Sequence, residues 1–306
     1  MLKLLAIISL VLITSSNRAN ASVVKTKSPD FVIVDSWLSG YVGGFVHGKG
    51  ARFKGAWKEA NKRATNDAKI WGGLFVSDTN RTAGYRIGEV VSRFVYQTPQ
   101  TLGGFCVSQY YNTITNKVNT VQYAEGATVL NMNVMWPGVA LGNYILAKKV
   151  ISTDPNNRMF QHEYGHYLQS KRMGWAYFVT VGLPAIMSKG VHDDHPVEVD
   201  CNREGFIYFN RFYSDFQNDT LLFDKKGWDF WYNPFPDTIG EKVYYKRDTL
   251  SYINAATCDE EALLQHLKIR PKLMDYASWL FIPAPVLVGG LHSRKYNKEA
   301  LKSINE

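Results

Sequence analysis

The chain contains little cysteine and no apolar run long enough to cross a bilayer. Only Cys106, Cys201 and Cys258 are cysteine, and a set this sparse and odd in number excludes a disulfide framework. At most one bridge can form, and its pairing stays open. The apolar stretches 175–187 and 279–291 are too short to span a membrane and are predicted to be buried. The fold must therefore depend on a hydrophobic core, for which a hydrophobic fraction of 45% is sufficient.

Motifs for binding nucleotides or nucleic acids are also missing. The formal net charge of +8 is spread along the chain without a dense basic run, so no nucleic-acid partner is predicted. The segment GGFVHGKG, residues 43–50, has the spacing of a phosphate-binding loop. Gly50, however, stands where such a loop needs Ser or Thr to ligate magnesium. We therefore interpret these glycines as loop or helix-packing residues.

Residues 1–21 have the layout of a secretory signal peptide. Lys3 precedes an apolar run, and the segment closes on the small residues of Ala19-Asn20-Ala21. A buried N-terminal helix is the alternative reading. The layout predicts an exported protein, periplasmic or extracellular, whose mature chain carries no transmembrane segment.

The remaining residues, 22–306, are predicted to form one domain of the α+β class. Its first part, 22–152, is rich in glycine and in strand-forming residues. Within it, Glu125-Gly126 separates two β-rich runs and predicts a hairpin, and 139–151 reads as one further strand. The second part, 153–306, is predicted to be mainly helical, with a mixed C-terminal region.

A helix is predicted over about 155–173. Asp154 is a suitable N-terminal cap, and Pro155 suits the first helical position. Lys171 and Arg172 fall in the last turn, where the helix dipole favours cations, and Gly174 can adopt the left-handed stop.

This helix carries the sequence FQHEYGHYLQ, in which two histidines lie one turn apart. Positions i and i+4 differ by about 40° around a helix axis, so His162 and His166 can bind one ion. The spacing is the H-E-x-x-H motif of zinc peptidases, in which Glu163 is the general base. Gly165 leaves room for close packing behind the ligands. The alternative is an ordinary amphipathic helix with a solvated glutamate.

A catalytic zinc site needs a third protein ligand. Pro196 predicts the start of a second helix, about 196–213, on which Glu198 and Asn202 share a face. Glu198 is the predicted third ligand, and Asn202 can accept a hydrogen bond from a ligand histidine. The neighbouring residues that compete with Glu198 are His192, Asp193, Asp194, His195 and Asp200.

H-E-x-x-H followed by E-x-x-x-N on a second helix resembles the gluzincin, or thermolysin-like, branch of zinc metallopeptidases. The segments LGNYI, FQHEYGHYLQS, VGLPAIMS and VEVDCNREGFIYF also resemble a group of uncharacterised exported bacterial proteins. This closer likeness covers about 139–210. In that group a histidine-rich loop leads into a W-T-E-x-x-A-N-R-like segment. Here Pro196-Val197 replaces the usual Trp-Thr, and Cys201 replaces the usual alanine.

The resemblance implies a zincin-like fold in which a small sheet packs on the motif helix. It implies Zn²⁺ held by His162, His166 and Glu198, a water activated by Glu163, and a peptide or protein substrate. A donor to the transition state is expected among Tyr208, His192 and His195. A sheet edge within ALGNYILAKK is the expected substrate-binding strand, although its Gly142-Asn143 can equally form a turn.

Two other functions remain open. The zinc hydrolase can act on a bond other than a peptide bond, because the motif does not distinguish substrates. Alternatively the zinc is structural, with Cys201 as a fourth protein ligand that closes the site.

Overall fold

The computed structural model describes residues 34–47, 52–148, 151–155, 157–189, 195–213, 238–239, 242–243, 264, 267, 269–281 and 283–302. The long helices are α2 (Val34–His47), α3 (Arg52–Gly73), α4 (Ala83–Val95), α5 (Thr98–Gln109), α6 (Arg158–Met173), α8 (Pro196–Phe212) and α12 (Ala284–Lys302). The short helical elements are η1 (Tyr110–Ile114), η2 (Gly174–Ala176), η3 (Phe178–Gly182), α7 (Leu183–Ile186), α11 (Leu273–Ala277) and η7 (Ser278–Leu280). The strands are β1 (Val118–Ala124), β2 (Ala127–Met132), β3 (Gly138–Leu141), β4 (Tyr144–Lys148), β5 (Thr238–Ile239) and β6 (Lys242–Val243). The α+β class is confirmed.

The main sheet has the strand order β1-β2-β4-β3 and mixed direction. β1 and β2 form the predicted hairpin around Glu125-Gly126, both of which have positive φ. β2 runs parallel to β4, and β3 pairs antiparallel with β4. The prediction of one strand over 139–151 is wrong, because Gly142 adopts a φ of 60° and turns the chain back between two short strands.

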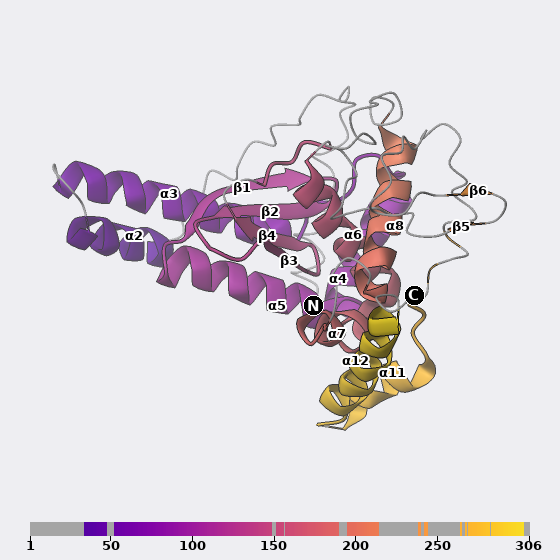
Figure 1. The fold of residues 1–306 in the computed structure, drawn as a ribbon. Coiled ribbons are helices and arrows are strands. Elements are labelled where there is room, and N and C mark those ends of the chain that lie inside the picture. The colour runs from indigo at the N-terminus through magenta and orange to yellow at the C-terminus, as the bar shows by residue number, and fades with distance from the viewer. Residues whose placement is uncertain are drawn as a thin grey trace.

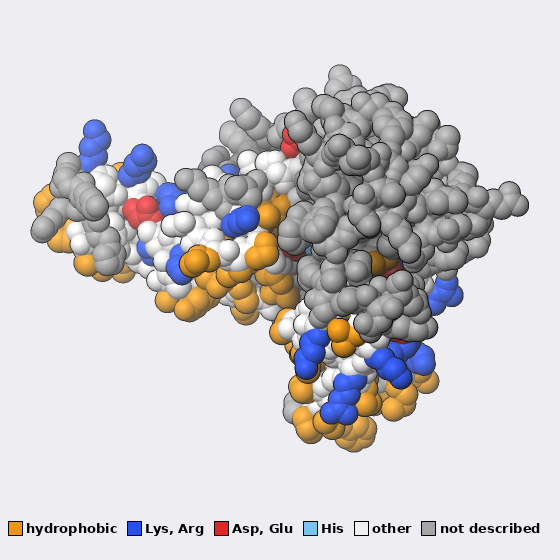
Figure 2. Space-filling model, in the orientation of Figure 1, with side chains coloured by type: hydrophobic (Ala, Val, Ile, Leu, Met, Phe, Trp, Pro, Cys, Tyr) orange, Lys and Arg blue, Asp and Glu red, His pale blue; other side chains and the backbone are white. Residues whose placement is uncertain are grey.

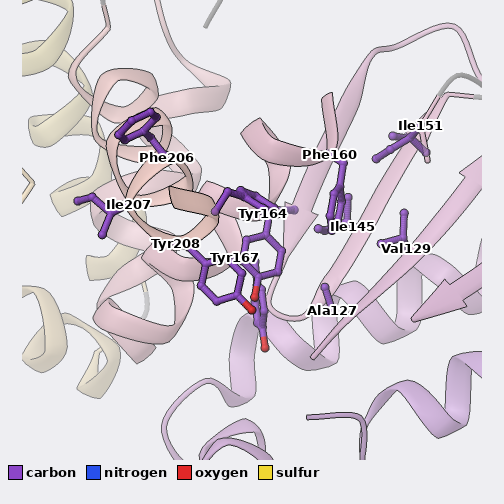
Figure 3. Packing of buried hydrophobic residues seen from close by; sticks show 13 residues of the cluster. Ala127, Val129, Ile145, Ile151, Phe160, Tyr164, Tyr167, Phe206, Ile207 and Tyr208 are labelled. Carbon is purple, nitrogen blue, oxygen red and sulfur yellow. The ribbon is translucent and has the colours of Figure 1, made fainter. Parts of the chain in front are cut away.

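Helices cover both faces of this sheet (Figure 1). Alternate residues of β2 and β4 point to opposite faces. On one face Leu130 and Leu146 belong to a buried cluster with Ile70 of α3. On the other face a second buried cluster includes Val129, Ile145 and aromatic residues of α6 and α8. Figure 3 shows Tyr164 and Tyr167 of α6 between these strands and α8, so packing against the sheet positions α6.

The prediction of a β-rich first part is wrong up to residue 114, where the described chain forms the helices α2 to α5 and η1. The surface helix that the polar stretch 53–71 predicts is confirmed as α3. The glycines of α2 belong to a helix and not to loops, because they allow α2 to pack closely on α3. A Cβ on Gly40 or Gly44 would lie 2.7 Å from the Cα of Ala60 or Ala56 on α3. These glycines therefore serve close helix packing, as the sequence allowed, and they do not mark loops. The α2–α3 hairpin extends beyond the sheet (Figure 1).

The second part of the chain is mainly helical where the structure describes it, as predicted, with the short strand pair β5–β6 as an exception. The stretch 175–187 is largely buried, through Ala176, Tyr177, Val179 and Val181. The prediction of burial for 279–291 is wrong, since Leu280, Phe281 and three further apolar side chains of that stretch are exposed. Among the described helices, none combines the length and the apolar character needed to cross a membrane.

Candidate metal centre

Helix α6 ends where the sequence predicts and begins three residues later. The side-chain oxygen of Asn157 accepts the Phe160 N–H at 3.0 Å and caps the helix, so Asp154 is not the cap. Lys171 and Arg172 do lie in the last turn, and Gly174 has a φ of 54°. The histidine motif therefore lies near the middle of a helix that is held at both ends.

Helix α8 begins at Pro196, as predicted, and crosses α6 at very short range. A Cβ on Gly165 would lie 2.0 Å from the Cys201 carbonyl oxygen, and one on Gly205 would lie 2.8 Å from the Gln161 carbonyl oxygen. Both positions therefore require glycine. Close contact of the two backbones brings the first turn of α8 over the histidine face of α6.

At this crossing the structure brings His162, His166 and Glu198 together. The Glu198 Oε2 lies 3.3 Å from the His162 Nε2 and 3.1 Å from the His166 Nε2. Two ligand atoms at about 2.0–2.1 Å from a tetrahedral zinc are separated by roughly 3.3 Å. All three side chains are buried. The separations therefore fit a shared ion, and these residues form a buried group that can hold a metal.

The far nitrogen of each imidazole is held by an amide side chain. The His162 Nδ1 lies 2.9 Å from the Asn202 Oδ1, and the His166 Nδ1 lies 2.8 Å from the Gln169 Oε1. Because an amide oxygen only accepts, each Nδ1 carries a hydrogen, and in the neutral ring Nε2 is the nitrogen left to bind an ion. The Gln169 amide nitrogen donates in turn to the Val197 carbonyl at 2.9 Å.

Asn202 thus lies where the sequence predicts, whereas Gln169 was missed. Gln169 is i+3 from His166 on the same helix, so helical spacing was the signal that could have found it.

Cys201 is the fourth member of the buried group, and it lies behind the His162 ring. Its Sγ is 3.5 Å from Nδ1, the nitrogen that Asn202 also contacts. The ligand lone pair is on the opposite side of the ring, at Nε2. Burial raises the pKa of the Cys201 thiol to about 12, which keeps it protonated at neutral pH. The geometry therefore favours a set of two nitrogens and one oxygen over a set that includes sulfur.

Glu163 faces the edge strand of the sheet. A Cβ on Gly138 of β3 would lie 2.4 Å from the Glu163 Oε1, so this carboxylate needs glycine opposite it. β3 is the last strand of the sheet, and the Lys148 N–H donates to the Pro137 carbonyl. In an antiparallel pair the hydrogen-bonding direction alternates, so the N–H and C=O of Gly138 point to the open edge. The candidate base therefore lies beside free backbone groups of an edge strand.

The charges in the site reinforce one another. Burial is the largest single influence on His166 and Glu198, and it disfavours the charged form of each. The attraction and the hydrogen bonds that these residues share with their neighbours together outweigh it. As a result the pKa of Glu198 falls well below its ordinary value, and the pKa of His166 rises to about 9. Without a metal, the pair holds a proton at neutral pH, and a cation can replace that proton.

The other predicted residues lie elsewhere or outside the described residues. Tyr208 was predicted as a donor to the transition state. Its hydroxyl instead accepts from the Asn80 amide at 3.2 Å, and its ring packs on Tyr164. The His195 ring packs edge-on against Tyr296 of α12, at the start of α8. Asp200 accepts the Ile269 N–H, which argues against it as a ligand.

His192, Asp193 and Asp194 lie outside the described residues, as does Cys258, while Cys106 and Cys201 are free thiols.

Comparisons of the chain with protein-family models, with curated proteins and with solved structures give no match. The case for a function therefore depends on the geometry of this site and on the motifs in the sequence.

Proposed function

We propose that the protein is an exported zinc-dependent hydrolase of peptide bonds. The observation that carries the proposal is the convergence of Glu198 on the Nε2 atoms of His162 and His166, with both Nδ1 atoms held by amides. Two histidines and one carboxylate are the donor set of catalytic zinc sites that leave one position open. The donor set fits Zn²⁺ and not a hard ion such as Mg²⁺ or Ca²⁺, which prefers oxygen ligands throughout.

The residues of the chain have distinct roles in this scheme. Zinc, when bound, polarises the substrate carbonyl and lowers the pKa of a water molecule. Glu163 takes a proton from the attacking water and passes it to the leaving amine. Its position one residue along from His162 turns it about 100° away from the ligand direction, toward Gly138.

The edge strand β3 is the proposed docking strand for an extended peptide. The outward N–H and C=O of Gly138 can pair with a peptide backbone, next to the Glu163 carboxylate. A glycine at this position also leaves the space that a peptide backbone needs. This arrangement supports a peptide as substrate over a small molecule.

The alternative of a structural zinc depends on Cys201, which belongs to the same buried group. If its Sγ rotated onto the ion, four protein ligands would close the site. Cys201→Ala separates the two functions. The hydrolase proposal expects metal content and activity to persist, whereas a structural site would lose metal.

The direct test of the hydrolase is Glu163→Gln. This change keeps the size of the side chain and removes its basicity, so zinc content should stay at the wild-type level. Cleavage of a quenched-fluorescence peptide library should fall by at least about a hundredfold, the usual contribution of a general base. Glu299→Gln, the same change at an exposed position of α12, is the matched control. Unchanged cleavage by Glu163→Gln would rule out the assigned base.

A further inference from the structure

The end of the lobe formed by α11, η7 and α12 exposes a group of large apolar side chains, here called the C-terminal tip. Its members are Leu273, Met274, Leu280, Phe281, Val286, Leu287 and Leu291, all at least 60% exposed. Figure 1 shows this lobe projecting away from the sheet, and Figure 2 shows hydrophobic side chains gathered at its free end. A contiguous exposed apolar surface of this kind marks an interaction site.

The inner face of helix α12 packs against the rest of the protein. Gly289 packs so closely on α7 that a Cβ there would lie 2.6 Å from a methyl carbon of Leu183, and Tyr296 and Ala300 are buried. Leu287 and Leu291 lie on the opposite, outer face, and Val286 is exposed near the start of the helix. They are therefore not unused core residues of this helix, and their exposure calls for a partner outside the described part of the chain.

Basic side chains follow the apolar ones along the same outer face. Arg294, Lys295 and Lys298, here called the basic collar, are exposed and lie about 5–10 Å further along the helix axis than Leu291. Arg270 and Lys272 are exposed beside Leu273.

Exposed acids are scarce around the tip. Of the two acidic residues within the described part of 269–302, Asp275 is buried and bonds the His292 ring at 2.8 Å. The other, Glu299, lies 3.8 Å from Lys295. Among the described residues around the tip, the exposed charged side chains are therefore mostly basic.

We propose that the C-terminal tip docks the protein on an anionic lipid surface. The apolar residues enter the boundary between headgroups and acyl chains, and the basic collar meets the phosphates of the headgroups. The sequence of apolar end, then basic ring, along one helix matches the order of these layers, which lie within about 5–10 Å of each other.

A second copy of the chain is a poorer occupant of this surface. A two-fold dimer through the tip places the same patch on both sides, so it brings two basic collars together. Like charges at such a distance repel, whereas an anionic surface attracts the collar. The inference is independent of the proposed hydrolase, since none of the metal-site residues contributes to it.

The test is sedimentation of the purified full chain with vesicles made of equal parts phosphatidylglycerol and phosphatidylcholine, against vesicles of phosphatidylcholine alone. Phe281→Ser removes a tip residue that is 72% exposed, and Phe53→Ser removes a matched phenylalanine, 71% exposed, at the start of α3. Every variant carries the same N-terminus, which intact mass confirms. The difference between variants therefore reports the tip and not residues 1–21.

We expect Phe281→Ser to lower partitioning into the anionic vesicles about tenfold, with Phe53→Ser close to wild type. Arg294→Gln with Lys298→Gln should remove the preference for the anionic vesicles, whereas Lys54→Gln with Lys58→Gln on α3 should not. No binding of the wild type to either vesicle overturns the proposal. An equal loss from Phe53→Ser also overturns it, as does a wild-type dimer that Phe281→Ser dissociates without any change in vesicle binding.

Discussion

The α2–α3 hairpin and the α6–α8 crossing are built in the same way and serve different purposes. Each depends on two glycines that allow the backbones of two helices to touch, Gly40 and Gly44 in the first and Gly165 and Gly205 in the second. In the hairpin the glycines face alanines. The polar contacts between its helices, such as Ser36 with Asp67 and Ser39 with Arg63, are hydrogen bonds that tie α2 to α3. At the crossing the same closeness brings a carboxylate within reach of two imidazoles. Close packing sets the distance, and the neighbouring side chains decide whether the contact is structural or chemical.

The largest effects should come from breaking the two glycine contacts. Gly165→Ala places a methyl group against the Cys201 carbonyl and forces the helices apart, which should cost about 1–3 kcal/mol or more in the free energy of unfolding. It should also abolish metal retention, because Glu198 moves with α8. Gly40→Ala should lower stability by a similar amount and leave the metal in place. Denaturant unfolding and elemental analysis measure the two quantities.

The control for this pair is Gly88→Ala on α4, where nothing lies within 4 Å of the added carbon. That change should stabilise the protein by about 0.5–1 kcal/mol through the helix preference of alanine. Wild-type zinc affinity in Gly165→Ala would contradict the role given to the crossing.

A smaller effect is expected from the amides that hold the imidazoles. Gln169→Ala and Asn202→Ala should each weaken zinc affinity about 10–100-fold, because the rings lose their fixed orientation and tautomer. Gln109→Ala on α5 is a control of the same kind, a glutamine whose amide donates to Asp67 instead. Competition with a chromogenic chelator measures the affinities, and equal affinities in all three variants would argue against this network.

The smallest expected change is in the apparent zinc affinity from one pH unit to the next. Zinc needs the neutral form of His166, whose pKa in the metal-free protein is about 9, above the ordinary 6.5. Binding below that pH displaces a proton, so apparent affinity should rise at least about tenfold per pH unit between roughly pH 7 and 9. The opposite sign holds for the metal-free protein. Its ion pair contributes full stability below pH 6.5 and loses that contribution as pH rises through 9. Chelator titrations at several pH values test the first slope, and denaturant unfolding of the metal-free protein at the same pH values tests the second. A flat profile in either measurement contradicts the assignment.

The comparison of the two helix pairs also shows how far sequence reasoning reaches. His162, Glu163 and His166 lie within one helical turn, so local spacing was enough to place them. Glu198 was within reach because Pro196 marks a helix start. Gln169 was missed although its i+3 spacing from His166 carried a signal. The Gly138 opposite Glu163 was missed because its role depends on a contact that the sequence does not reveal.

The errors in the fold have the same origin. The sequence left the glycines of α2 as either loop or helix-packing residues, and the choice needs the alanines of α3 that face them. The one-strand reading of 139–151 failed at Gly142, whose turn is held against Thr101 of a distant helix. Exposure of 279–291 could not be predicted either, since an apolar stretch looks the same whether it faces a core or a lipid surface.

The most direct test of the central claim is the zinc content of the purified chain, measured by elemental analysis after exhaustive dialysis, in the wild type, Glu198→Ala and Cys201→Ala. The account predicts one zinc per chain in the wild type and in Cys201→Ala, and a substantial loss in Glu198→Ala, because the carboxylate and not the thiol completes the site. Full zinc in Glu198→Ala together with its loss in Cys201→Ala would contradict the account and assign the site to a different set of ligands.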